Sequence, residues 1–380
     1  MRLFYQMSTG KKILLLHLHS NGDCLYATAI ARQIKHDHPG CRLTWVVATW
    51  AKSVLENNPY IDEIVEVPDV NKNTNTRIHR EQLRAALAKK AAGEYDEVFS
   101  TQLIDDNIAY YDGTIRSGIL RAYGRPITQG VQPVLRLREA EIATTAAFAE
   151  RHKLAEYRNV ILFEFAPQSG QLAITTDMAL NIARQIVENP GTCIILSSAN
   201  RIDAGDARII DGSVLTLRET AALSHYCTLL IGCSSGISWI TTSDAGKMLP
   251  MLQILDAYMP WVNPITRDFE RCGMPDDEVL EIYDNDPAFI VRCAGEILNG
   301  DIREVKKKYQ KPLPLHFIGT SRNIYNMLCF LQFGAIAKHI RINVSVWGWH
   351  PLLVRAIVWG FVSAPFKLVR NVVVKRVLKK

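Results

Sequence analysis

The stretch KKILLLHLHSNGDCLYATAIARQIKHDHPGCRLTWVV, residues 11–47, indicates the fold of the chain. It opens with an apolar run, 13–18, that is typical of a buried parallel strand, and continues with a polar turn that contains Gly22. Apolar residues then recur at helical spacing from 26 to 35, and a second apolar run follows at 43–47. Strand, glycine-containing turn, helix and strand in this order predict a βαβ unit.

The same alternation recurs in two series, one before and one after a joint near residues 135–158. Further strands are expected at 64–67, 97–100, 160–165, 192–196, 228–231 and 251–255, and further helices at 50–57, 80–92, 177–188 and 218–226. Alternating strands and helices form parallel sheets covered on both faces, so we expect an α/β protein with two facing doubly wound domains. The first domain is expected at 1–150, the second at 151–302 and an extension at 303–380.

The composition is that of a globular protein, with 48% hydrophobic and 22% charged residues among 380. The eight cysteines form no C-x-x-C pair, which favours buried, reduced thiols in the cytoplasm over a zinc site. The apolar run near the N-terminus is too short for a signal peptide, and we expect no membrane-spanning helix. We therefore expect a cytoplasmic protein that needs neither metal nor cofactor.

The net charge of +6 is unevenly distributed. Residues 303–380 contain 15 lysines and arginines and one acid, Glu304, so the rest of the chain is mildly acidic. Towards the end these cations alternate with large apolar side chains, namely Trp347, Trp349, Trp359, Phe361 and Phe366. This pattern predicts a basic amphipathic helical extension that lies on an anionic membrane surface through residues 347–380, at the inner face of the cytoplasmic membrane. The alternative is a helix packed on the body of the protein; no motif indicates a nucleic-acid partner.

Ligands of open parallel sheets bind at the carboxyl ends of the strands, where the loops 19–23, 166–171 and 232–236 are expected. These loops predict the walls of a cleft between the two domains. Asp23 follows the first strand, and a carboxylate there can take a proton from a hydroxyl that attacks a second substrate. It can equally cap the helix that follows it. The neighbouring residues of the same loop are expected to bind that hydroxyl's substrate: His19, Ser20, Asn21 and Gly22.

The other two loops are candidates for holding a phosphorylated ligand. Small residues between a strand and a helix leave backbone N–H groups free for phosphate oxygens, although tight turns often use the same residues for no ligand. The residues expected to bind this ligand are Ser234, Ser235 and Gly236 in one loop and Gln168, Ser169, Gly170 and Gln171 in the other.

Several segments together resemble the bacterial heptosyltransferases of glycosyltransferase family 9. The family opens with a strand and the pattern S-x-G-D, which Ser20, Gly22 and Asp23 match. Later segments are similar as well, namely NPYIDEIVEVP at 58–68 and LTLRETAALSHYCTLLIGCSSGISWI at 215–240. The resemblance implies a GT-B fold and an inverting, metal-independent transfer of sugar from a nucleotide-sugar donor to a lipid-linked or lipopolysaccharide-type glycan. It places the catalytic base at Asp23, the acceptor on the N-terminal domain and the donor on the C-terminal domain.

Three departures from the family pattern affect the donor site. Ser234 stands where the family usually has Asp, and Trp239 where it has His. The loop at 167–173 also lacks the basic residue that the family often carries there. These differences leave open a different donor sugar or a catalytically inactive, glycan-binding scaffold. A GT-B-fold nucleotide-sugar epimerase is the third possibility, although it would need no lipid acceptor and gives no reason for the basic extension.

Overall fold

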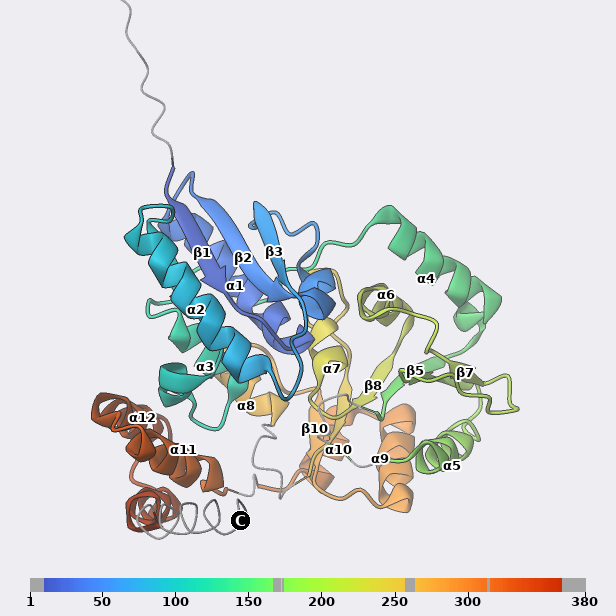
Figure 1. Cartoon of the computed structure of the whole chain (residues 1–380). Helices are drawn as coiled ribbons and strands as arrows, with labels where there is room; N and C mark the ends of the chain where they lie inside the picture. The colour runs from blue at the N-terminus through green and yellow to red at the C-terminus, as the bar shows by residue number, and fades with distance from the viewer. Residues whose placement is uncertain (1–9, 167–171, 173, 257–263, 313–314, 364–380) are drawn as a thin grey trace, which may run out of the picture.

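The computed structural model describes residues 10–166, 172, 174–256, 264–312 and 315–363, and its arrangement is shown in Figure 1. The N-terminal half contains a four-stranded parallel sheet in the order β3-β2-β1-β4. Its strands are β1 (Lys12–Leu16), β2 (Arg42–Ala48), β3 (Glu63–Val67) and β4 (Glu97–Ser100). Its helices are α1 (Asn21–Asp37), α2 (Asn75–Ala91) and α3 (Ile115–Ala122), with the 3₁₀ turns η1 (Thr49–Leu55) and η2 (Asp105–Tyr110). The helix expected at 50–57 is thus a 3₁₀ turn that ends at Leu55, and it cannot continue through Asn57, whose φ of 61° is left-handed.

The second half contains a six-stranded parallel sheet in the order β10-β9-β8-β5-β6-β7. Its strands are β5 (Asn159–Glu164), β6 (Thr192–Ser197), β7 (Ile209–Asp211), β8 (Leu229–Gly232), β9 (Met251–Ile254) and β10 (Val279–Ile282). Its helices are α5 (Thr176–Ile186), α6 (Leu217–Leu223), α7 (Gly236–Ile240), α8 (Ile265–Cys272), α9 (Pro287–Asn299) and α10 (Ile302–Tyr309). Both series predicted from the sequence are therefore present, and the two edge strands β7 and β10 are additions to them.

The joint expected at 135–158 contains a helix, α4 (Glu139–Arg151), and the turn η3 (Leu154–Glu156). Helix α4 packs against α6 of the second half. Arg218 of α6 is almost fully buried, and its Nε lies 2.6 Å from the carboxylate of Glu141 in α4. The same guanidinium donates to the carbonyl oxygen of Ser53, at 2.9 Å, so one side chain joins the N-terminal half, the joint and the second half.

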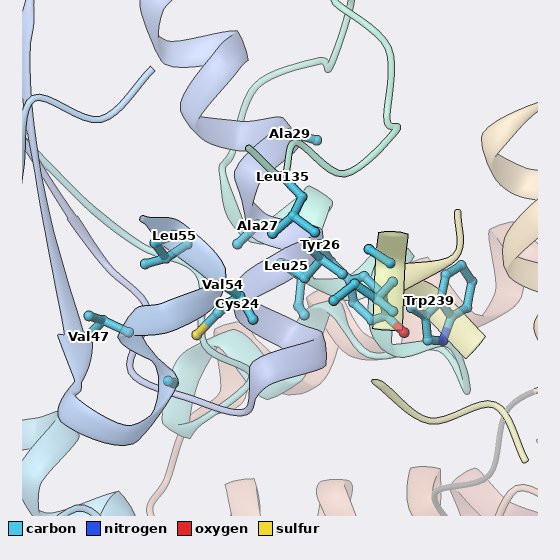
Figure 2. Close-up of a cluster of buried hydrophobic side chains, with 14 of the residues drawn as sticks. Cys24, Leu25, Tyr26, Ala27, Ala29, Val47, Val54, Leu55, Leu135 and Trp239 are labelled. Atoms are coloured by element: carbon cyan, nitrogen blue, oxygen red, sulfur yellow. The ribbon is translucent and has the colours of Figure 1, made fainter. Parts of the chain in front are cut away.

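The two halves share one apolar core. Tyr26 of α1 points towards Trp239 of α7, and their ring centroids lie 4.8 Å apart in an edge-to-face arrangement (Figure 2). The guanidinium of Arg116, from α3, lies 4.8 Å from the centroid of the Trp239 ring and is fully buried. Because large rings from both halves pack together here, the halves are held in a fixed contact beside the loops expected to form the cleft.

The extension returns to the N-terminal half. After α10 it contains α11 (Ile318–Cys329), α12 (Phe333–Trp347) and a helix at 351–363. Helix α12 packs on α11 and on η2, and both helices are drawn below α3 in Figure 1. One face of α12 bonds to three carbonyl oxygens at the end of η2 and just after it. His339 contacts that of Ala109, Asn343 that of Tyr111 and Trp347 that of Asp112, at 3.3, 3.2 and 2.7 Å. Within the described residues, no helix is long and apolar enough to cross a membrane.

Two parts of the extension differ from the sequence-based expectation. Trp347 was expected at a membrane surface, but its indole bonds to Asp112 and packs on Phe317, with ring centroids 5.8 Å apart. The lysines at 306–308 lie on α10, which packs on α9 and β10. Lys306 and Lys308 pair with Asp276 and Glu296 of the body, and Lys307 pairs with Glu304 on the same helix. The start of the extension therefore follows the alternative interpretation of the basic pattern, in which the helix packs on the body of the protein and its cations are paired.

The anchoring role of Trp347 can be tested by truncation. Trp347→Ala removes the bond to Asp112 and the packing on Phe317, and we expect it to lower the free energy of unfolding by about 2–3 kcal/mol. Trp349→Ala is the matched control, because its side chain is 71% exposed, and we expect a change within about 0.5 kcal/mol. Urea unfolding measures both. Equal effects of the two substitutions would contradict an anchor at Trp347.

Candidate active site

Asp23 lies in the first turn of α1, at the carboxyl edge of the first sheet. The sequence analysis placed it in a turn before the helix, but α1 already begins at Asn21, with Ser20 as its N-cap. The backbone N–H of Ser20 donates to Oδ2 of Asp23 over 3.4 Å, which is a long bond. Burial raises the pKa of this carboxyl to about 6. The bond from Ser20 lowers the pKa, but by less than burial raises it. Asp23 therefore contributes to the cap and is also basic enough to take a proton near neutral pH.

The first turn of α1, which carries Gly22 and Asp23, meets the loop at 232–236. A Cβ atom added to Gly22 would lie 3.6 Å from the Cα of Gly236, so the starts of α1 and α7, which belong to different halves, approach each other with room for little more than a methyl group. Larger side chains on both would press the loops apart. The structure thus brings together two of the three loops that the sequence analysis selected. The residues Gln168, Ser169, Gly170 and Gln171 of the third loop lie outside the described residues.

Most backbone N–H groups around the 232–236 loop already have partners. The carboxylate of Glu164, at the end of β5, lies near those of Cys233, Ile237 and Ser238, which act to lower its pKa. The side-chain oxygen of Gln253 accepts that of Ser234 at 2.5 Å. The N–H groups of Ser235 and Gly236 contact neither the Glu164 nor the Gln253 side chain. These two N–H groups are therefore the candidates for binding a phosphate at this loop.

Glu164 is a candidate that the sequence analysis missed. It is 3% exposed, and burial raises the pKa of its carboxyl to about 7 although the hydrogen bonds around it act in the opposite direction. The hydroxyl of Ser238 also donates to it, at 3.3 Å. The sequence did contain a signal for this residue: an acid stands inside the apolar run VILFEF, immediately before a candidate loop. A carboxylate that is buried there needs hydrogen-bond donors around it.

Ser234 stands in the position where the resembling family carries Asp, and its backbone is unusual. Its φ of 56° lies in the left-handed region, which residues other than glycine seldom adopt. Such conformations persist only where the surroundings enforce them, and here the bond from its N–H to Gln253 does so.

Three histidines lie near one another at the same edge of the first sheet. His17 is fully buried, its Nδ1 lies 2.9 Å from the hydroxyl of Thr101, and burial together with His19 and His79 lowers its pKa to about 3. His79, which the sequence analysis did not select, bonds to the hydroxyl of Ser100, and burial lowers its pKa to about 4. Burial lowers the pKa of His19 as well. The surroundings of all three rings therefore favour the neutral form, which can donate one hydrogen bond and accept another.

The substitution of Trp for the family's His at 239 has a structural reason. Trp239 is 2% exposed and lies edge-on against Tyr26 on one side and Phe269 on the other, with centroids 4.8 and 5.6 Å away. It also covers the guanidinium of Arg116. Trp239 thus fills the contact between the halves and is not available to a donor.

The described residues contain no group of three or more His, Cys, Asp or Glu side chains that is suited to hold a metal ion. The eight cysteines are free thiols, six of them buried.

No protein-family model and no curated protein matches the chain. Solved structures do match it. A glycosyltransferase family 9 structure from Veillonella parvula has a TM-score of 0.50 and 16% identity over 72% of this chain and 86% of its own. The Escherichia coli ADP-heptose LPS heptosyltransferase II has a TM-score of 0.47 and 15% identity over 76% and 98%. A putative UDP-N-acetylglucosamine 2-epimerase from Listeria monocytogenes has a TM-score of 0.49 and 11% identity over 84% and 97%.

The two facing parallel-sheet halves define the GT-B class of α/β folds. The resemblance to glycosyltransferase family 9 that the sequence analysis identified is confirmed at the level of the fold. At 16% identity the likeness extends to the fold alone, and fold does not determine the reaction.

Proposed function

We propose that the chain is an inverting glycosyltransferase that moves a sugar from a nucleotide-sugar donor to a lipid-linked or lipopolysaccharide-type glycan. The observation that carries this proposal is the meeting of two loops. Gly22, next to Asp23, faces Gly236, so a carboxyl whose pKa is about 6 lies beside the loop expected to hold the donor. The S-x-G-D pattern that Asp23 completes supports the same role.

In this proposal the acceptor lies along His19, Ser20, Asn21 and Gly22, and Asp23 takes the proton of its hydroxyl. The hydroxyl oxygen then forms a bond to the anomeric carbon as the bond from that carbon to the diphosphate breaks. The electron pair leaves with the nucleoside diphosphate, whose oxygens the N–H groups of Ser235 and Gly236 stabilise. The loop at 168–171 is proposed as a further donor contact. We propose that no metal takes part, so that EDTA leaves turnover unchanged.

A position at an anionic membrane, on the cytoplasmic side, completes the proposal. Among the described residues 18 large apolar side chains are exposed, and 11 of them lie between residues 318 and 362. Trp349, Trp359 and Phe361 are 71%, 58% and 42% exposed, respectively. A concentration of apolar side chains on a basic extension is what an interfacial helix requires.

The pKa of Asp23 predicts the pH dependence of transfer. A base acts only when ionised, so with a pKa raised to about 6 we expect kcat to fall about tenfold per pH unit below pH 6 and to level off above pH 7. An Asp with an ordinary pKa would keep its activity down to about pH 4. Turnover between pH 4.5 and 8 measures this, with circular dichroism at each pH to exclude unfolding. A rate that stays constant down to pH 5 in folded protein would contradict a base with a pKa raised to about 6.

Donor binding is the first test of the function. Ligands that bind the native state raise its unfolding temperature, so we expect one series of nucleotide sugars among ADP, GDP, UDP, CDP, TDP and CMP types to do so in a thermal-shift screen. The corresponding nucleoside diphosphate should act similarly, and the nucleoside alone should not, because the proposed contacts are to phosphate. If no nucleotide-sugar series raises the unfolding temperature, even with membrane glycans present, the chain is better explained as a binding scaffold that uses no donor.

A further inference from the structure

A pocket of about 870 Å³ opens where α3, α8 and the end of α12 meet. Four guanidinium groups line it, from Arg121 and Arg125 at the end of α3 and from Arg267 and Arg271 on α8. Among the described lining residues a single carboxylate, that of Glu270, opposes them. None of the lining residues belongs to the loops 19–23 and 232–236, so this pocket is separate from the proposed transfer site.

The acids around the pocket do not balance its cations. Arg121 and Arg271 share one carboxylate, that of the fully buried Asp112, at 2.7 and 3.0 Å. Arg267 pairs with Glu270 at 2.6 Å. Arg125 lies 2.8 Å from the ring of His38, which brings no negative charge. Its ion-pair partner is the carboxylate of Glu97, 3.9 Å away, which also pairs with Lys11 and Lys90 at 3.8 and 3.3 Å. Positive charge therefore remains on a concave surface, which favours an anionic ligand.

The indole of Trp347 holds two of these arginines in place. Its ring centroid lies 5.6 Å from the guanidinium carbon of Arg267 and 5.3 Å from that of Arg271. Guanidinium groups held by an aromatic ring lose less freedom when they bind an anion, and their planar donors match phosphate oxygens. Because Trp347 belongs to the extension, this arrangement exists only where the extension has folded back on the body.

An apolar groove continues from the pocket. Its volume is about 320 Å³, and Leu315 lines both the pocket and the groove. Ile318, Leu352 and Trp359 are among the apolar side chains that line it, and they are 51%, 42% and 58% exposed; Arg355 also lines the groove. A cationic pocket joined to an apolar groove matches a ligand with an anionic head and a hydrocarbon chain.

We propose that the pocket and the groove bind an anionic phospholipid, with its phosphate among the four arginines and an acyl chain along Leu315, Leu352 and Trp359. This site refines the proposed membrane contact of the extension, because it recognises one kind of headgroup and does not merely attract negative charge. It depends on neither the donor nor the acceptor of the proposed transfer.

The test compares two double variants of the full chain that remove equal charge. Arg125→Gln/Arg267→Gln changes the two pocket arginines that do not hold the buried Asp112, and their side chains are 40% and 39% exposed. Arg42→Gln/Arg77→Gln is the matched control, since both side chains are 64% exposed and lie outside the pocket. Isothermal titration calorimetry measures binding of dihexanoyl phosphatidic acid below its micelle concentration, with dihexanoyl phosphatidylcholine and inorganic phosphate as further probes.

We expect dihexanoyl phosphatidic acid to bind wild type and the control alike, and the pocket variant at least tenfold more weakly. Dihexanoyl phosphatidylcholine and inorganic phosphate should each bind wild type at least tenfold more weakly than phosphatidic acid. Equal losses in both double variants would show attraction by net charge only and overturn the site. Inorganic phosphate that binds as well as phosphatidic acid would overturn the lipid assignment. No sugar substrate is present, so a failure here is distinct from a failure of the proposed transfer.

Discussion

Asp23→Asn is expected to slow sugar transfer by about 10²–10⁴-fold while leaving donor affinity within about twofold. The amide has nearly the shape of the carboxylate and can still accept the N–H of Ser20, but it cannot take the proton of an acceptor hydroxyl. The loss should therefore appear in kcat. Initial rates at saturating donor and acceptor measure it, and donor titration by calorimetry measures the affinity.

Asp177→Asn is the matched control for the capping role of Asp23. Asp177 is exposed and also lies in the first turn of a helix, α5, in the other half of the chain. If Asp23 only stabilised its helix, the two substitutions would change stability by similar small amounts and leave turnover unaltered. Full activity of Asp23→Asn would exclude Asp23 as the base and leave it the role of a cap.

Trp239→Ala is expected to lower the free energy of unfolding by about 3–5 kcal/mol. The indole is 2% exposed and packs between Tyr26 and Phe269, so its removal leaves a cavity in the core that the two halves share. It also uncovers the guanidinium of Arg116, a fully buried cation whose centre lies 4.8 Å from the ring. A buried charge that loses its neighbours adds to the cost of the cavity.

Trp50→Ala is the control for this second prediction. Trp50 is 48% exposed and makes one hydrogen bond, from its indole to the carbonyl oxygen of Val70, so we expect a loss of about 1 kcal/mol. Urea unfolding, followed by circular dichroism, compares both variants with wild type. If Trp239→Ala were no more destabilising than Trp50→Ala, the two halves would not depend on this contact.

The alternation of strands and helices in the sequence was sufficient to predict both parallel sheets and the GT-B class. Buried parallel strands such as β5 and β6 are continuous apolar runs, so their signal is local. The edge strand β7 was missed because a run of three residues carries no periodicity. The edge strand β10 was missed as well, although β4, β8 and β9 are equally short and were predicted. Helix α4 was not predicted, because the alanines and threonines at 143–147 make the apolar stripe that packs on α6 difficult to recognise in the sequence.

The candidate site was predictable only in part. Asp23 and Gly236 stand out because turns after strands are recognisable in a sequence, but their proximity through Gly22 arises from the packing of the two halves. Glu164 lies near the N–H groups of a loop that is about 70 residues away in the sequence. No local sequence pattern predicts such a contact. The position of Trp347 shows the same limitation. An aromatic residue on a basic helix suits a membrane surface, and only the tertiary structure reveals that Asp112 binds it.

The most direct test of the proposed transfer is the release of nucleoside diphosphate from the donor identified by thermal shift, measured with and without lipid-linked or lipopolysaccharide-type glycans. We predict release that requires both the donor and the glycan, with the sugar recovered on the glycan in inverted configuration. Conversion of the donor to an isomeric sugar without any glycan would contradict the transfer and favour an epimerase. Absence of release with every glycan supplied would contradict catalysis at Asp23 and favour a binding scaffold.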